Sequence, residues 1–63
     1  MARWVRTPCE SGVCVEIGKL DYGDFAIRNS NFKADKVIFT EAEIIAFLWA
    51  AKKGHFDRLL DIP

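Results

Sequence analysis

The strongest hydrophobic pattern in the chain has helical spacing and lies between residues 41 and 53. Apolar residues recur there at intervals of three and four positions, as on one helix face: Ile44, Phe47, Leu48 and Ala51. A second apolar pair, Ile45 and Trp49, lies four positions apart on an adjoining face. An ordinary surface helix needs only one apolar stripe. The pattern therefore predicts a helix over 41–53 with an additional apolar face.

Both ends of this predicted helix carry boundary signals. Thr40 followed three positions later by Glu43 fits a capping box, in which each side chain accepts a hydrogen bond from a backbone N–H of the other residue. Acidic residues occupy the first turn and lysines the last, which suits the helix dipole. Gly54 supplies the left-handed residue that ends many helices. We therefore predict Thr40, Glu43 and Gly54 as the structural caps.

The second apolar face has two possible partners. It can close against the C-terminal tail of the same chain, through Phe56, Leu59 and Leu60, or it can contact another chain. Tryptophan and phenylalanine are common anchors at protein interfaces. Three residues are therefore the candidate protein-interaction site: Ile45, Trp49 and Phe56.

Before the helix, apolar and polar residues alternate as in β-strands. The alternation predicts strands at 3–7, 13–19, 25–30 and 36–40, with a loop at 8–12 and a tight hairpin turn at 21–23. That turn sets a register, in which Lys19 faces Phe25, Ile17 faces Ile27 and Val15 faces Asn29. The same register places Glu16 opposite Arg28 and predicts an ion pair.

The order of these elements predicts a small α+β domain over residues 1–63. We expect an antiparallel β-meander of three to four strands packed against one C-terminal helix. The helix should lie across one sheet face and bury its main stripe there. This prediction pairs Ile44, Phe47 and Leu48 with Val15, Ile17 and Ile27.

Composition narrows the functional classes. The chain has 63 residues, of which 51% are hydrophobic, so an exposed apolar patch is expected on so small a domain. The charges of nine basic and nine acidic residues cancel, so the chain has no overall positive charge that would attract nucleic acid or an anionic membrane. No apolar run approaches the about 18 residues of a membrane span, and the first residues lack the apolar core of a signal peptide. We expect a cytoplasmic protein.

Cys9 and Cys14 allow three interpretations: a zinc site, a disulfide or two reduced thiols. Structural zinc usually takes four Cys or His ligands, and His55 is the only histidine. A short-loop disulfide is geometrically possible but is opposed by a reducing cytoplasm. We expect two reduced thiols, with Cys14 packed in a strand, and no metal or cofactor. Since no nucleophile and base converge, we also expect no catalytic residues and no enzymatic activity.

Several short motifs, in order, resemble the actinobacterial family known as domain of unknown function 397. They are Trp4, Ser11-Gly12, Cys14-Val15-Glu16-Ile17, Ala26-Ile27-Arg28-Asn29-Ser30, Phe39-Thr40-Glu41-Ala42-Glu43, Ala46-Phe47-Leu48 and Lys52-Lys53-Gly54-His55-Phe56-Asp57. The likeness runs from Trp4 to Asp57. Asn29 stands where the family usually has an acid, and His55 stands where it usually has an acidic residue.

The resemblance implies a regulatory role. Members of that family look like partners of Xre-type helix-turn-helix regulators, in arrangements likened to toxin–antitoxin or anti-regulator pairs. We therefore predict a protein-interaction module that binds such a regulator, itself, or both. The alternatives are a homo-oligomeric structural module and a weak direct DNA binder, for which Arg3, Arg6, Lys52 and Lys53 are the only local signal.

Overall fold

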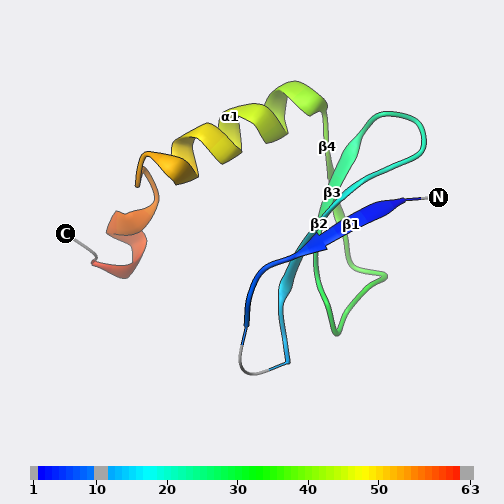
Figure 1. The fold of residues 1–63 in the computed structure, drawn as a ribbon, viewed down its shortest axis with the longest axis horizontal. Coiled ribbons are helices and arrows are strands. Elements are labelled where there is room, and N and C mark those ends of the chain that lie inside the picture. Colours follow the sequence, from blue (N-terminus) through cyan, green and yellow to red (C-terminus); the bar gives the residue numbers. More distant parts are fainter. Residues whose placement is uncertain (1, 10–11, 62–63) are drawn as a thin grey trace.

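A computed structural model describes residues 2–9 and 12–61 and shows a four-stranded sheet followed by one helix (Figure 1). The elements are β1 (Arg3–Arg6), β2 (Val15–Lys19), β3 (Phe25–Asn29), β4 (Val37–Phe39), α1 (Glu41–Lys52) and a 3-10 turn, η1 (Asp57–Leu60). The predicted α+β class is confirmed. Residues 10 and 11 of the predicted loop, and residues 1, 62 and 63 of the predicted domain, lie outside the described residues.

The sheet is an antiparallel meander in the order β1-β2-β3-β4. The predicted register of the central hairpin is confirmed, including the facing pairs Ile17–Ile27 and Glu16–Arg28. Its turn uses Gly23 at φ 93°, a conformation that favours glycine. The hairpin could be predicted because turn length and side-chain alternation together allow few registers.

Strand alternation sorts the side chains onto two faces. One cross-strand row runs Val5, Ile17, Ile27 and Val37, and the face that carries this row is called the open face. The next row runs Trp4, Gly18, Ala26 and Ile38, on what is called the closed face. The closed face also carries Arg6, Cys14, Glu16, Arg28 and Ser30 by the same alternation.

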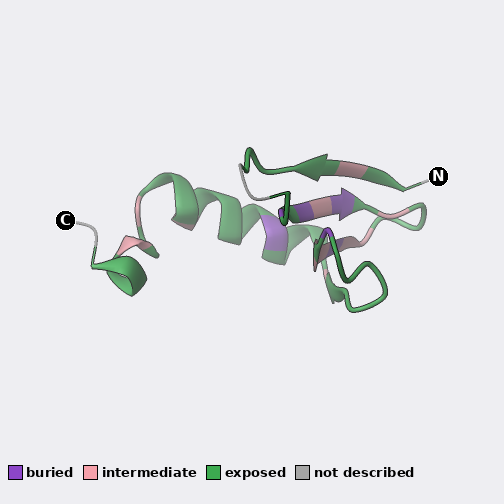
Figure 2. Ribbon diagram, turned by 90° about the horizontal axis from the view of Figure 1, so that it is seen from below, coloured by how far each residue is buried: buried purple, intermediate pink, exposed green. Residues whose placement is uncertain are grey.

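Burial is concentrated on the closed face, although this face carries Arg6, Glu16 and Arg28. Along the chain, buried positions lie on or directly beside β2 and β3 and in the first half of α1 (Figure 2). The buried residues of the closed face are Cys14, Glu16, Gly18, Ala26 and Ser30. No residue of the four described strands is buried on the open face, and Val5, Val15 and Val37 are exposed there. The closed face therefore holds the buried residues of the sheet, whereas the open face is largely exposed.

Helix α1 does not lie across the sheet as predicted. Ile44 is 3% exposed, but Phe47 and Leu48 are both exposed, so only the first part of the predicted stripe is buried. The connection from β4 to α1 is the single residue Thr40, and its backbone is extended. No loop is therefore present in which the chain could turn back over the strands. The helix consequently runs away from the end of the sheet, and its C-terminal half lies beyond the strands (Figure 1).

Both predicted helix caps are confirmed. The Thr40 hydroxyl accepts a hydrogen bond from the backbone N–H of Glu43, and the Glu43 carboxylate accepts one from the backbone N–H of Thr40. At the other end Gly54 has φ 74°. The N–H of Gly54 donates to the Ala51 carbonyl and that of His55 to the Ala50 carbonyl, which is the Schellman pattern. The caps define the helix length without help from the sheet.

Candidate interaction surface

The face of α1 that carries Ile45 and Trp49 is exposed. Trp49 is 59% exposed, and a hollow of about 360 Å³ is lined by Ile45, Leu48, Trp49, Ala51 and Lys52. The ammonium groups of Lys52 and Lys53 lie 5.4 and 5.8 Å from the Trp49 ring. Each is within the range of a cation–π contact. The result is an apolar surface with a cationic border.

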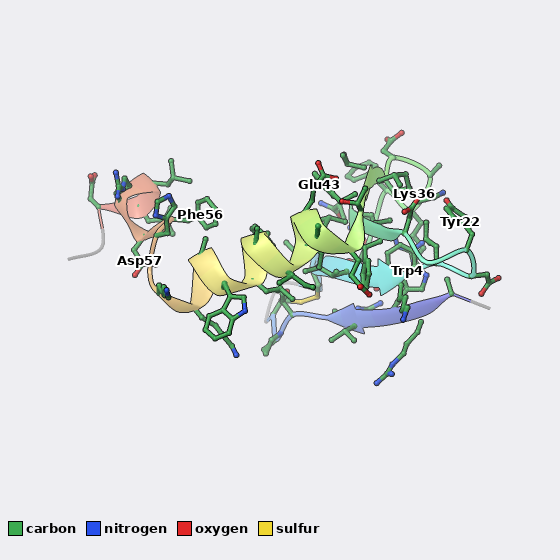
Figure 3. The ribbon with its side chains drawn as sticks, turned by 90° about the horizontal axis from the view of Figure 1, so that it is seen from above. Trp4, Tyr22, Lys36, Glu43, Phe56 and Asp57 are labelled. Carbon is green, nitrogen blue, oxygen red and sulfur yellow. A yellow bond between two sulfur atoms is a disulfide. The ribbon has the colours of Figure 1, made fainter. Side chains whose placement is uncertain are left out.

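The C-terminal tail does not cover this face, so of the two possible partners the tail of the same chain is excluded. Phe56 contacts Phe47 instead, with ring centroids 5.6 Å apart. The left-handed turn at Gly54 reverses the chain and brings Phe56 to the Phe47 side of the helix (Figure 3). Ile45 and Trp49 therefore lie together, whereas Phe56, the third predicted interaction residue, is not among the residues that line their hollow.

A larger groove lies between the open face and the first half of α1. Its volume is about 520 Å³. Its lining includes side chains from three strands and the helix: Val5, Ile17, Phe25, Ile44 and Leu48. Leu48 lines both this groove and the hollow beside Trp49. The two form one continuous apolar surface, which sequence analysis missed because it placed the helix over this part of the sheet.

Polar side chains on the closed face form a self-contained cluster. Arg28 Nε donates to Glu16 Oε1 at 2.8 Å, which confirms the predicted pair, and Arg6 Nε donates to Glu16 Oε2 at 3.0 Å. These hydrogen bonds, Arg28 first and Arg6 second, hold the pKa of Glu16 below its ordinary value, against the opposite effect of burial. Every buried side-chain nitrogen and oxygen among the described residues has a hydrogen-bond partner.

Trp4 covers this cluster. The Arg28 guanidinium carbon lies 3.5 Å from the centroid of the Trp4 ring. A Cβ atom at Gly18 would come within 2.5 Å of the same ring, so the indole needs a glycine beneath it. The signal that could have revealed this contact was a glycine inside a strand, on the same face as an aromatic residue of the neighbouring strand. Trp4, Gly18 and the Glu16 ion pairs thus stabilise this face within one chain, although Ile38 at its β4 edge is 44% exposed.

Cys9 and Cys14 form a disulfide, so the expectation of two reduced thiols is wrong. Their Cα atoms are 5.8 Å apart, which is ordinary for a disulfide. The Thr7 N–H donates to the Val15 carbonyl at 2.9 Å and brings the two ends of the intervening loop together. Cys14 is buried, as expected for a strand residue, although it lies just before the observed β2.

Among the residues that the structure describes, no group of His, Cys, Asp and Glu could hold a metal ion. His55 is exposed, and its ring lies edge-on to Phe56 with centroids 5.4 Å apart. No described helix is long and apolar enough to cross a membrane.

Comparisons with protein-family models, curated protein sequences and solved structures found no match.

Proposed function

We propose that this chain is a small non-enzymatic interaction module that binds an Xre-type helix-turn-helix regulator through the exposed face of α1. The observation that carries the proposal is the surface around Ile45, Leu48 and Trp49, which neither the sheet nor the tail covers. A half-exposed tryptophan beside two apolar neighbours has the character of an interface anchor. The resemblance to domain of unknown function 397 supports the class of partner.

Charge supports a protein partner over DNA. The cations next to Trp49 are Lys52 and Lys53, and the chain as a whole has zero formal net charge. Affinity for DNA comes largely from many phosphate contacts, which two lysines on one helix do not provide. An acidic border around an apolar patch on the regulator would suit these lysines better.

The proposal includes a cytoplasmic location, where such regulators act. The reducing cytoplasm opposes the Cys9–Cys14 disulfide. The proposed interface does not depend on the disulfide, since Ile45 and Trp49 lie on α1, between its own caps.

The test is binding of the purified chain to a purified Xre-type regulator encoded beside it. Trp49→Asp should abolish binding while leaving the fold intact, because Trp49 is exposed. Tyr22→Asp is the matched control: Tyr22 is an exposed aromatic in the β2–β3 turn, away from the C-terminal end of α1 (Figure 3). Equal binding by wild type and Trp49→Asp would exclude this surface. Retardation of DNA by the chain alone would favour the DNA-binding alternative.

A further inference from the structure

The apolar groove between the open face and α1 is not filled by side chains of its own chain. A compact folded monomer of 7.2 kDa exposes about 4,100 Å² of surface. This chain exposes 5181 Å². Its radius of gyration is 12.7 Å, compared with about 10.6 Å for a compact chain of this length. The surface that this chain exposes beyond that of a compact monomer is of the same order as the about 800 Å² that each partner buries in a standard protein interface.

The border of this groove is cationic. Arg3 and Lys19 line it and are cross-strand neighbours, so two like charges face each other on β1 and β2. Like charges in this position are destabilising unless an anion lies nearby. No ion pair joins either residue to a carboxylate of the described chain, and the groove lining contains no Asp or Glu. The chemistry that fits the groove is an apolar segment with an adjoining carboxylate.

The chain itself carries such a segment. Leu59 and Leu60, in η1, are 77% and 76% exposed and are the most exposed large hydrophobic side chains described. Asp61 follows them directly and is also exposed. Two leucines match the apolar lining of the groove, and the Asp61 carboxylate matches the cations at its border.

This segment lies far from the groove of its own chain. The groove includes Ile44, near the start of α1, whereas η1 follows the end of the helix (Figure 1). The 12 residues of α1 span about 18 Å between them. If two helices run antiparallel, however, the tail of each copy lies beside the start of the other helix. Leu48, which lines both the groove and the outer hollow, lies along that path.

We infer that the chain forms a symmetric homodimer in which the tail of each copy, Leu59 to Asp61, docks into the groove of the other. The exchange is reciprocal, so the dimer closes on itself and leaves no free groove. Each leucine pair completes the core beneath the partner's α1, and each Asp61 pairs with the partner's cationic border. This inference goes beyond the proposed function, and Leu48 is the one residue that both surfaces share.

The test is sedimentation equilibrium of the full chain. Wild type should have twice the 7.2 kDa mass of one chain. The double variant Leu59→Asp, Leu60→Asp should keep its far-ultraviolet spectrum, because both residues are exposed within one chain, and should weaken the dimer on the order of a hundredfold. Tyr22→Asp, the exposed aromatic control, should remain dimeric.

A charge exchange tests the pairing itself. Lys19→Glu should weaken the dimer, and adding Asp61→Lys to the same chain should restore it, because reciprocal docking then pairs the reversed charges. A wild-type chain that stays monomeric over the whole accessible concentration range would overturn the inference. So would a dimer that is unaffected by the leucine substitutions, since its interface would lie elsewhere.

Discussion

The closed face of the sheet carries the charged residues Arg6, Glu16 and Arg28 and holds the buried residues of the described strands, whereas Val5, Val15 and Val37 on the open face are exposed. On the closed face, Trp4 lies over Gly18 and Arg28, and the Glu16 carboxylate is paired on both sides. On the open face only Ile44 of the helix reaches a buried position. Cross-strand pairs can therefore satisfy polar side chains within one chain, whereas an apolar face needs an element that covers it.

The substitution with the largest expected effect truncates Ile44, the one buried side chain of α1. Ile44→Ala should destabilise the fold by about 2–4 kcal/mol, because it deletes most of a fully buried side chain. A core this small supplies only about 3–5 kcal/mol, so the variant should lose most of its stability and unfold at a much lower urea concentration than wild type. Urea titration followed by circular dichroism measures the change.

Ile45→Ala is the matched control for this prediction. Ile45 neighbours Ile44 on the same helix but is half exposed, so its truncation should change stability by less than about 0.5 kcal/mol. Equal losses of stability in the two variants would show that contacts other than the burial of Ile44 hold the helix against the sheet.

The next effect is expected from the disulfide, which joins Cys9 to the buried Cys14. Opening this short loop should cost about 2 kcal/mol by the chain-entropy account. Thermal unfolding with and without a reducing agent measures it. Cys9→Ser should resemble the reduced wild type and should not respond to the reductant; a response of the variant would assign the effect to something else.

A smaller effect is expected from adding a methyl group to the closed face. Gly18→Ala should cost about 1–2 kcal/mol, because its Cβ would meet the Trp4 ring and displace it from Arg28. Val5→Ile adds the same group to the exposed residue of the open face and should be nearly neutral. Denaturant midpoints of both variants measure the two losses of stability. Equal losses in Val5→Ile and Gly18→Ala would contradict the prediction.

The effect that depends on pH comes from Glu16. Its pKa is lower in the folded chain than the ordinary value of 4.5, because Arg28 and Arg6 donate hydrogen bonds to it. Its contribution to stability is therefore complete above that value and is lost as the pH falls through the folded-state pKa. Stability of wild type should decline across that acidic window, and the decline should be shallower in Glu16→Gln. If the free energy of unfolding fell equally with pH in wild type and Glu16→Gln, the acid sensitivity would come from other carboxylates.

Local patterns predicted much of this structure. The capping box at Thr40 and Glu43, the left-handed Gly54 and the hairpin register all depend on residues a few positions apart or joined by one tight turn. The Glu16–Arg28 pair followed from that register. Such features need no knowledge of how the elements pack.

The position of α1 was decided only by the tertiary structure. Helical periodicity identifies an apolar stripe but does not say what covers it, and the single-residue connection at Thr40 directs the helix away from the sheet. The groove, the exposure of Leu48 and Trp49, and the contact between Phe47 and Phe56 all follow from that direction. The elements and their caps could thus be read from short stretches of sequence. The direction of α1 determined which apolar surface remains available to another chain, and neither helical periodicity nor a capping box says in which direction a helix leaves its strand.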